Sequence, residues 1–201
     1  MVSMSETVIV KYNAGNIQSV LYAMDRIGHQ AVVTDDEQRI RNAARVIFPG
    51  VGEASTAMQY LRERGLDKLL IELTQPVLGI CLGMQLMCRF SEENDTDGLG
   101  IFQEDVRRFQ PGDTGLKVPQ IGWNKVHDLR SPLFEGIAED AYFYFVHSYF
   151  AAKGEDTIGV ADYIQPYSAA LHRRNFYGVQ FHPEKSAIAG ERLLTNFMKL
   201  T

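Results

Sequence analysis

Short apolar segments alternate with segments of helical periodicity over the first 81 residues, and this alternation limits the chain to few folds. The segment TVIVKY (7–12) is rich in β-branched residues, and the apolar residues after it recur every three or four positions from Ile17 to Ile27. Repeated strand–turn–helix units build a parallel sheet with helices on both faces. The other elements expected here are strands at 30–34, 45–48 and 76–80 and helices at 53–64 and 66–73.

The second half has a different pattern, because strand-like segments follow one another closely from about residue 98 onward. This spacing predicts antiparallel pairing, followed by a final helix at 189–200. No repeat or flexible linker divides the chain, so we expect 1–201 to form one α/β domain. Its architecture would be a mostly parallel central sheet flanked by helices, with an additional antiparallel sheet in the C-terminal half. The strand candidates are 100–109, 117–126, 141–150, 158–163, 168–173 and 176–181.

Composition excludes several classes of function. The 201 residues are 45% hydrophobic and 22% charged, as in an ordinary globular protein that buries roughly 70% of its unfolded surface. The net charge of −5, with scattered Lys and Arg, argues against general nucleic-acid binding. No apolar segment approaches the roughly 20 residues that span a bilayer, and the N-terminus lacks a signal-peptide layout. We therefore expect a cytoplasmic protein without membrane contact.

The cysteines and histidines carry no sign of a metal site or disulfide framework. The two cysteines, Cys81 and Cys88, are too few for a disulfide framework, so both are expected to be free thiols. No Cys/His cluster has the spacing of metal ligands, and no cofactor is expected.

The stretch VLGICLGMQL (77–86) places Cys81 between two glycines where a strand gives way to a helix. G-x-C-x-G at such a junction matches a nucleophile elbow, in which Gly79 and Gly83 leave room for a sharp turn. The helix N-terminus favours a thiolate, and the Leu82 N–H could stabilise an oxyanion. A buried structural cysteine is an equally good interpretation of Cys81 alone. Cys88, within the following helix, is assigned to the core.

The stretch GVQFHPEKS (178–186) supplies the best candidate for a base. His29, His127 and His172 have the surroundings of surface residues, and His147 lies in an aromatic strand where packing is expected. Pro183 keeps His182 extended, so the side chains of His182 and Glu184 should project from the same side of the chain. Glu184 could then orient the imidazole for base catalysis. Taken alone, His-Pro-Glu is more simply a polar turn.

The two stretches together resemble the signatures of the class I, triad-type glutamine amidotransferases, G-x-C-x-G-x-Q and F-H-P-E. The resemblance implies hydrolysis of the L-glutamine side-chain amide to glutamate and ammonia. In that family's pattern Cys81, His182 and Glu184 form the triad, and the PGVG loop lines the oxyanion site. As a structural alternative, PGVG is only a tight turn. The substrate and oxyanion residues implied are Gly50, Val51, Gly52, Leu82 and Gln85.

Three further segments, YNAGNIQSV (12–20), PQIGWN (119–124) and YFVHSY (144–149), resemble the glutaminase subunits of imidazole glycerol phosphate synthase. In that family the ammonia passes to a separate (βα)8-barrel cyclase subunit, which makes imidazole glycerol phosphate and AICAR. The resemblance implies a heterodimer with the cyclase. Lys11 departs from the acidic or small residue common at its position, which weakens inference about the neighbouring turn only.

The same resemblance places Asn16, Trp123 and Lys185 on the side that faces the cyclase. Trp123 is the only tryptophan, and it is as well interpreted as a core residue as an interface hot spot. Lys185 could equally be a solvated lysine. Two rival functions share parts of this pattern: the glutaminase that feeds pyridoxal phosphate synthesis, and a stand-alone thiol hydrolase of γ-glutamyl peptides. The first should lack the GWN and HSY segments, and the second should act without a partner.

Overall fold

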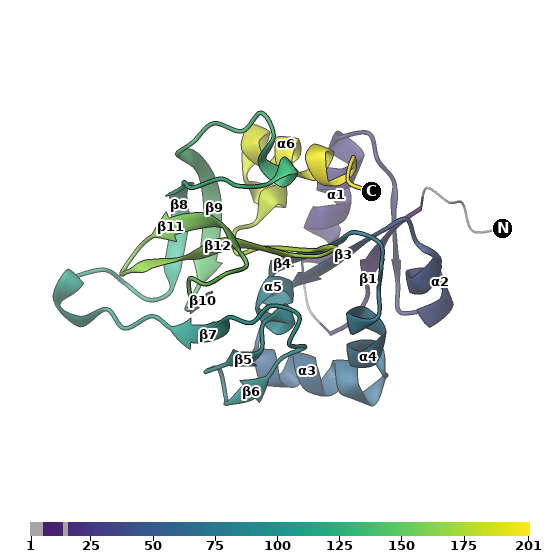
Figure 1. Ribbon diagram of the computed structural model, residues 1–201, viewed down its shortest axis with the longest axis horizontal. Coiled ribbons are helices and arrows are strands. Elements are labelled where there is room, and N and C mark those ends of the chain that lie inside the picture. Colours follow the sequence, from purple (N-terminus) through teal and green to yellow (C-terminus); the bar gives the residue numbers. More distant parts are fainter. Residues whose placement is uncertain (1–5, 14–15) are drawn as a thin grey trace.

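The computed structural model describes residues 6–13 and 16–201 and shows a large mixed sheet between two layers of helices (Figure 1). Within these residues the large sheet has 11 strands, and five neighbouring strands at one side run parallel. Their spatial order is β2 (Ala31–Thr34), β1 (Thr7–Val10), β3 (Arg45–Gly50), β4 (Val77–Cys81) and β13 (Phe176–Val179). This arrangement confirms the expected mostly parallel sheet flanked by helices.

The alternation of side chains along the parallel strands gives the sheet two apolar faces. Val8 and Val10 belong to one buried cluster and Ile9 to the other, as the two-residue period of a strand requires. The first cluster packs against α2 (Glu37–Asn42), α3 (Ala54–Glu63), α4 (Leu66–Ile71) and α5 (Leu82–Met87). The second packs against α1 (Ile17–Arg26) and α6 (Ala187–Phe197), which lie together on the opposite face in Figure 1.

Antiparallel strands extend the sheet beyond β13, as the closely spaced segments predict. The strands β12 (Pro166–Arg173), β11 (Thr157–Asp162) and β10 (Tyr149–Ala151) follow, and then come β7 (Asp105–Arg108), β5 (Phe90–Ser91) and β6 (Thr96–Asp97). Among these strands only β5 and β7 pair in parallel. A separate ribbon joins β8 (Gln120–Val126) to β9 (Ala141–His147) and confirms the additional antiparallel sheet. Short 3₁₀ turns occupy Gly112–Thr114, Pro132–Phe134 and Pro183–Lys185.

The predicted elements differ from the observed ones in several places, among them the short strands β5 and β6, which were not expected. The helix α2 was not expected; it is short, largely polar and capped by Asp36, whose carboxylate accepts from Arg39 N at 2.7 Å. The segment 141–150 is two strands, because the chain passes from the ribbon to the large sheet at Ser148. The helix after Cys81 ends at Met87, since Cys88 is already extended. Cys88 is fully buried, which confirms its assignment to the core.

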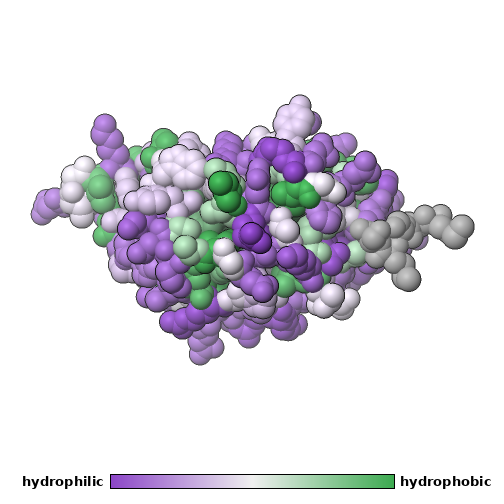
Figure 2. All heavy atoms as spheres, turned by 90° about the horizontal axis from the view of Figure 1, so that it is seen from above, coloured by the Kyte–Doolittle hydropathy of each residue, from purple (hydrophilic) through white to green (hydrophobic). Residues whose placement is uncertain are grey.

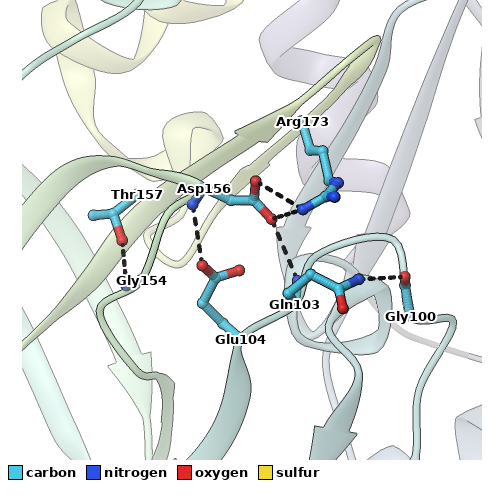
Figure 3. A network of polar contacts seen from close by, with 7 residues as sticks. All are labelled: Gly100, Gln103, Glu104, Gly154, Asp156, Thr157 and Arg173. Atoms are coloured by element: carbon cyan, nitrogen blue, oxygen red, sulfur yellow. Dashed lines mark hydrogen bonds and ion pairs between the residues drawn. The ribbon is translucent and has the colours of Figure 1, made fainter.

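A polar network centred on the buried residues Asp156 and Glu104 fastens the antiparallel extension to the loop before β7 (Figure 3). Asp156 accepts hydrogen bonds from Gln103 N and from Arg173 Nη1, both at 3.3 Å, and its own N–H donates to Glu104 Oε1 at 3.1 Å. Burial raises the pKa of Glu104. The network joins segments about fifty residues apart, and so it ties the start of β11 and the end of β12 to the loop before β7. No helix in the described part of the chain has the length and apolar composition needed to cross a membrane.

Candidate active site

Cys81 lies at the turn between β4 and α5, in a backbone conformation that residues other than glycine rarely adopt. Its φ is 54° and its ψ is −111°. This is the sharp strand-to-helix turn expected of a nucleophile elbow, and such a conformation costs about 1–3 kcal/mol. The surrounding fold therefore holds Cys81 in this position at the expense of stability.

Glycine is needed at positions 79 and 83 because neighbouring atoms leave no room for a Cβ there. A Cβ at Gly83 would run into the carbonyl oxygen of Phe48, and a Cβ at Gly79 would meet the side chain of Met87. Both glycines thus let α5 lie directly against β3 and β4. The packing supports the elbow interpretation of G-x-C-x-G.

His182 and Glu184 follow β13, which pairs in parallel with β4. Because parallel strands end at the same edge of a sheet, the residues after β13 come close to Cys81 although they lie about a hundred positions away. His182 Nδ1 is 2.7 Å from Glu184 Oε1, and both side chains are buried. The structure therefore brings the three predicted triad residues together.

Electrostatics at His182 favour its charged form. Burial alone lowers the pKa of His182, but hydrogen bonding to Cys81 and to Glu184 together with their charges raises it to about 10. The Nε2 atom is buried and has no partner at full hydrogen-bonding geometry, and the nearby Cys81 thiol is one of the two groups that raise the pKa of the ring. The raised pKa keeps the His182 imidazole protonated at neutral pH.

A pocket of about 390 Å³ opens beside Cys81 and collects most of the predicted substrate residues. Gly50 pairs in register with Cys81, and Gly52 has a φ of 116°, a conformation that favours glycine. The pocket wall contains Val51, Gly52, Leu82 and Gln85 from one side of the site and Val146, His147, Ser148 and Tyr149 from the other. Val51 and Gly52 therefore border the space where a ligand of Cys81 would lie, whereas Gly50 lies beside Cys81 in the sheet but is not part of the pocket wall.

Two residues of the site were missed by the sequence reasoning. Glu93 lines the pocket, accepts a hydrogen bond from Ala54 N at 2.7 Å and has a pKa raised by burial. Gln180 is completely buried, and its Nε2 is 3.7 Å from Cys81 Sγ. Gln180 lies inside the quoted stretch GVQFHPEKS, where its position two residues before His182 was an available signal. Glu93 lies in a polar loop with no such signal.

The three predicted partner-facing residues lie near the His182 segment. Trp123 is 52% exposed, so it is not a core residue, and its ring stands edge-on to Tyr144 with centroids 6.1 Å apart. Lys185 is exposed, with Nζ 5.8 Å from the centre of the Tyr144 ring. Asn16 donates a hydrogen bond to Glu184 Oε1. Ala14 and Gly15, in the turn of the quoted segment 12–20, lie outside the described residues.

His147 was predicted to pack within an aromatic strand, and the structure confirms this. His147 is buried on β9, and its Nδ1 contacts Tyr149 O at 2.7 Å. Burial lowers the pKa of His147 to about 4, so this ring is neutral at physiological pH. Within residues 6–13 and 16–201, no three His, Cys, Asp or Glu side chains are grouped so as to hold a metal ion.

Comparison with known proteins matches this geometry to one family. The profile of the family described as "Glutamine amidotransferase class-I" matches residues 8–200. "Imidazole glycerol phosphate synthase subunit HisH" of Bacteroides fragilis (strain YCH46) is 57% identical over 192 residues, covering 96% of this chain and 98% of the relative. The HisH subunit of Haemophilus influenzae (strain 86-028NP) is 45% identical over 197 residues, covering 98% of each chain.

A solved structure supports the same fold. A crystal structure of a glutamine amidotransferase superposes with a TM-score of 0.72 at 20% identity, covering 96% of this chain and 97% of the other. The profile match and the identities extend over nearly all of this chain. The chain therefore belongs to the class I glutamine amidotransferase family and, within it, to the HisH subunits of imidazole glycerol phosphate synthase.

Proposed function

We propose that this protein hydrolyses L-glutamine to glutamate and ammonia through Cys81, His182 and Glu184, as the glutaminase subunit of imidazole glycerol phosphate synthase in histidine biosynthesis. The observation that carries the proposal is the buried His182–Glu184 pair beside Cys81, in a chain that belongs to this family. Residues 1–201 would act as one glutamine amidotransferase domain in the cytoplasm, without a cofactor.

The reaction follows from the arrangement of these three groups. The thiolate of Cys81 attacks the amide carbon of glutamine, and the protonated His182 donates its proton to the leaving ammonia as the C–N bond breaks. Water then adds to the thioester carbonyl while His182 accepts its proton. The C–S bond breaks with its electron pair going to sulfur, which releases glutamate and restores the thiolate–imidazolium pair. Glu184 holds the His182 ring throughout.

The pocket supplies the other interactions that this reaction needs. The N–H groups of Leu82 and of residues 50–52 would stabilise the oxyanion that forms on the amide carbonyl. Glu93 offers a carboxylate to the α-ammonium group of the substrate, and Gln85 contacts its polar atoms. A pocket of about 390 Å³ has room for an amino acid of this size.

The ammonia would pass to a (βα)8-barrel cyclase subunit in a heterodimer, which forms imidazole glycerol phosphate and AICAR. The ribbon β8–β9 is the best candidate for the contact, because it exposes aromatic side chains beside the triad. The His182 N–H donates to Tyr144 O at 2.9 Å, so this ribbon is bonded directly to the triad segment. On the face seen in Figure 2, apolar residues form small separate groups among polar ones.

The proposal is tested by glutamate release from glutamine, measured with and without a matching cyclase and its nucleotide ligand. A large rise on adding both is the expected result, and it would identify the reaction and the pathway together. Full activity of the isolated chain would favour the stand-alone thiol hydrolase. Glutamate release that does not respond to the cyclase would favour a sister glutaminase.

A further inference from the structure

Gln180, which the reaction above does not use, connects the nucleophile to the buried amide group of Gln85. It follows β13 directly, and its backbone N–H donates to Ala169 O at 2.8 Å, which fixes its main chain. The side chain is completely buried between Gln85 and Cys81. A buried amide needs partners for both its oxygen and its NH₂ group.

The orientation of the Gln180 amide is set by its neighbours. The Tyr149 carbonyl can only accept, so the Gln85 atom 2.8 Å from it must be the NH₂ group. The second hydrogen of that NH₂ group is directed to Gln180 Oε1 at 2.9 Å. Gln180 Oε1 is thereby occupied, and the Gln180 NH₂ group is left facing Cys81 Sγ at 3.7 Å.

The carbonyl at the start of this chain is itself held in place. Tyr149 O also lies 2.7 Å from His147 Nδ1, which must be the protonated nitrogen of that neutral ring. Both lone pairs of the carbonyl are thus used, which leaves it no freedom to turn away from Gln85. The chain from His147 through Tyr149 and Gln85 therefore ends in a preoriented N–H donor beside the sulfur.

We propose that Gln180 is a further catalytic residue, whose amide N–H donates a hydrogen bond to the sulfur of Cys81 whenever that sulfur is negatively charged. The catalytic part of this inference rests on the proposed function, whereas the contact with the sulfur does not. Sulfur carries negative charge before it attacks the substrate and again when the thioester C–S bond breaks. A hydrogen bond to a charged acceptor is roughly twice as strong as one to a neutral acceptor.

The arrangement also refines the role of Gln85. Both hydrogens of its NH₂ group are used within the protein, so only its Oε1 remains for a substrate in the pocket. Gln85 is therefore a positioning residue for Gln180 as well as part of the pocket wall.

The test is the rate at which iodoacetamide alkylates Cys81 in the full chain at neutral pH, without glutamine. Gln180→Leu removes the N–H donor, and Gln180→Glu keeps the side-chain shape and the acceptor for Gln85 while turning an oxygen toward the sulfur. We expect alkylation of Cys81 to be roughly tenfold slower in both variants. Tyr167→Phe is the matched control, because it removes a buried hydroxyl next to His147 without approaching the sulfur. It should react like the wild type.

Alkylation of Cys88 would indicate damage to the fold, because Cys88 is fully buried and burial raises the pKa of its thiol. Slower labelling of Cys81 with Cys88 still unlabelled supports the proposal, and a fall in kcat at unchanged KM for glutamine in the assembled enzyme supports its catalytic part. Wild-type rates in both Gln180 variants, or an equal loss in Tyr167→Phe, would overturn it. Absence of glutamine hydrolysis by the wild type with its cyclase would instead refute the proposed function, while the alkylation result would stand.

Discussion

His182 Nδ1 and Glu184 Oε1 lie 2.7 Å apart within the protein, with almost no exposure of either side chain. The same carboxylate oxygen accepts a hydrogen bond from Asn16, so its position is fixed from two sides. A buried carboxylate in this position orients the imidazole and stabilises its charged form. The orientation leaves Nε2 free for Cys81.

Replacing Glu184 by Gln should lower kcat for glutamine hydrolysis by about a hundredfold or more, because a neutral amide no longer stabilises the imidazolium. The measurement is glutamate release by the complex with the cyclase. Glu191→Gln is the matched control, since Glu191 also pairs with a basic side chain, Arg26, but at the surface. A kcat within twofold of the wild type in Glu184→Gln would show that the carboxylate has no role in catalysis.

The two buried histidines should have opposite charge states at pH 7. The pKa of His182 is raised to about 10 and that of His147 is lowered to about 4, so His182 is charged and His147 is neutral. Since the folded pKa of His182 exceeds its usual value of 6.5, its proton stabilises the fold fully below pH 6.5, and this contribution is lost toward pH 10. Nitrogen chemical shifts of the two rings measure the charges directly. A neutral His182 at pH 7 would contradict the ion pair.

Gly83→Ala should lower the free energy of unfolding by about 1–3 kcal/mol, because the new Cβ would run into the Phe48 carbonyl and push α5 away from β3. Urea unfolding measures the change. Gly159→Ala is the control, since there a Cβ would have its nearest neighbour, the side chain of Val126, at 3.3 Å. Equal stability of the two variants would mean that Gly83 is not needed for packing at the elbow.

Trp123→Ala should weaken binding to the cyclase by about tenfold without lowering the temperature of unfolding, since its half-exposed ring is outside the core. Lys185→Ala should have a smaller effect, because a surface ion pair with a carboxylate of the barrel contributes about 0–1 kcal/mol. Calorimetric titration with the cyclase measures both. Ile71→Ala, an exposed apolar residue on α4, is the control. Binding unchanged in both variants would remove the ribbon from the interface.

The sequence was sufficient for the parallel half of the fold, because its strands are continuously apolar and its longer helices have a clear period. The expected strand 76–80 is β4 at Val77–Cys81, and the expected helix 53–64 is α3 at Ala54–Glu63. The short helix α2 was missed, since its sequence EQRIRN buries only Ile40 and gives almost no periodic signal. The break at Ser148 depends on which sheet each half of the segment joins, and local pattern does not contain that information.

The residues of the candidate site were likewise predicted only in part. Cys81, His182 and Glu184 lie in stretches whose glycines and proline have local conformational meaning, and the structure places them together. Glu93 has no local signal for its place in the pocket wall, because that place depends on segments distant in the chain. Gln180 had a signal in its position two residues before His182, but its contact with the sulfur depends on the fold. Trp123 had two equal interpretations, and only its exposure in the folded chain decides against the core.

The most direct test of the account is the Cys81→Ala variant in complex with the cyclase, assayed for product formation with glutamine and separately with an ammonium salt. If Cys81 is the nucleophile, synthesis from glutamine should be abolished, and synthesis from ammonium should remain at the wild-type rate. Loss of both activities would mean that Cys81 is needed for the structure, and full activity with glutamine would mean that another residue performs the hydrolysis.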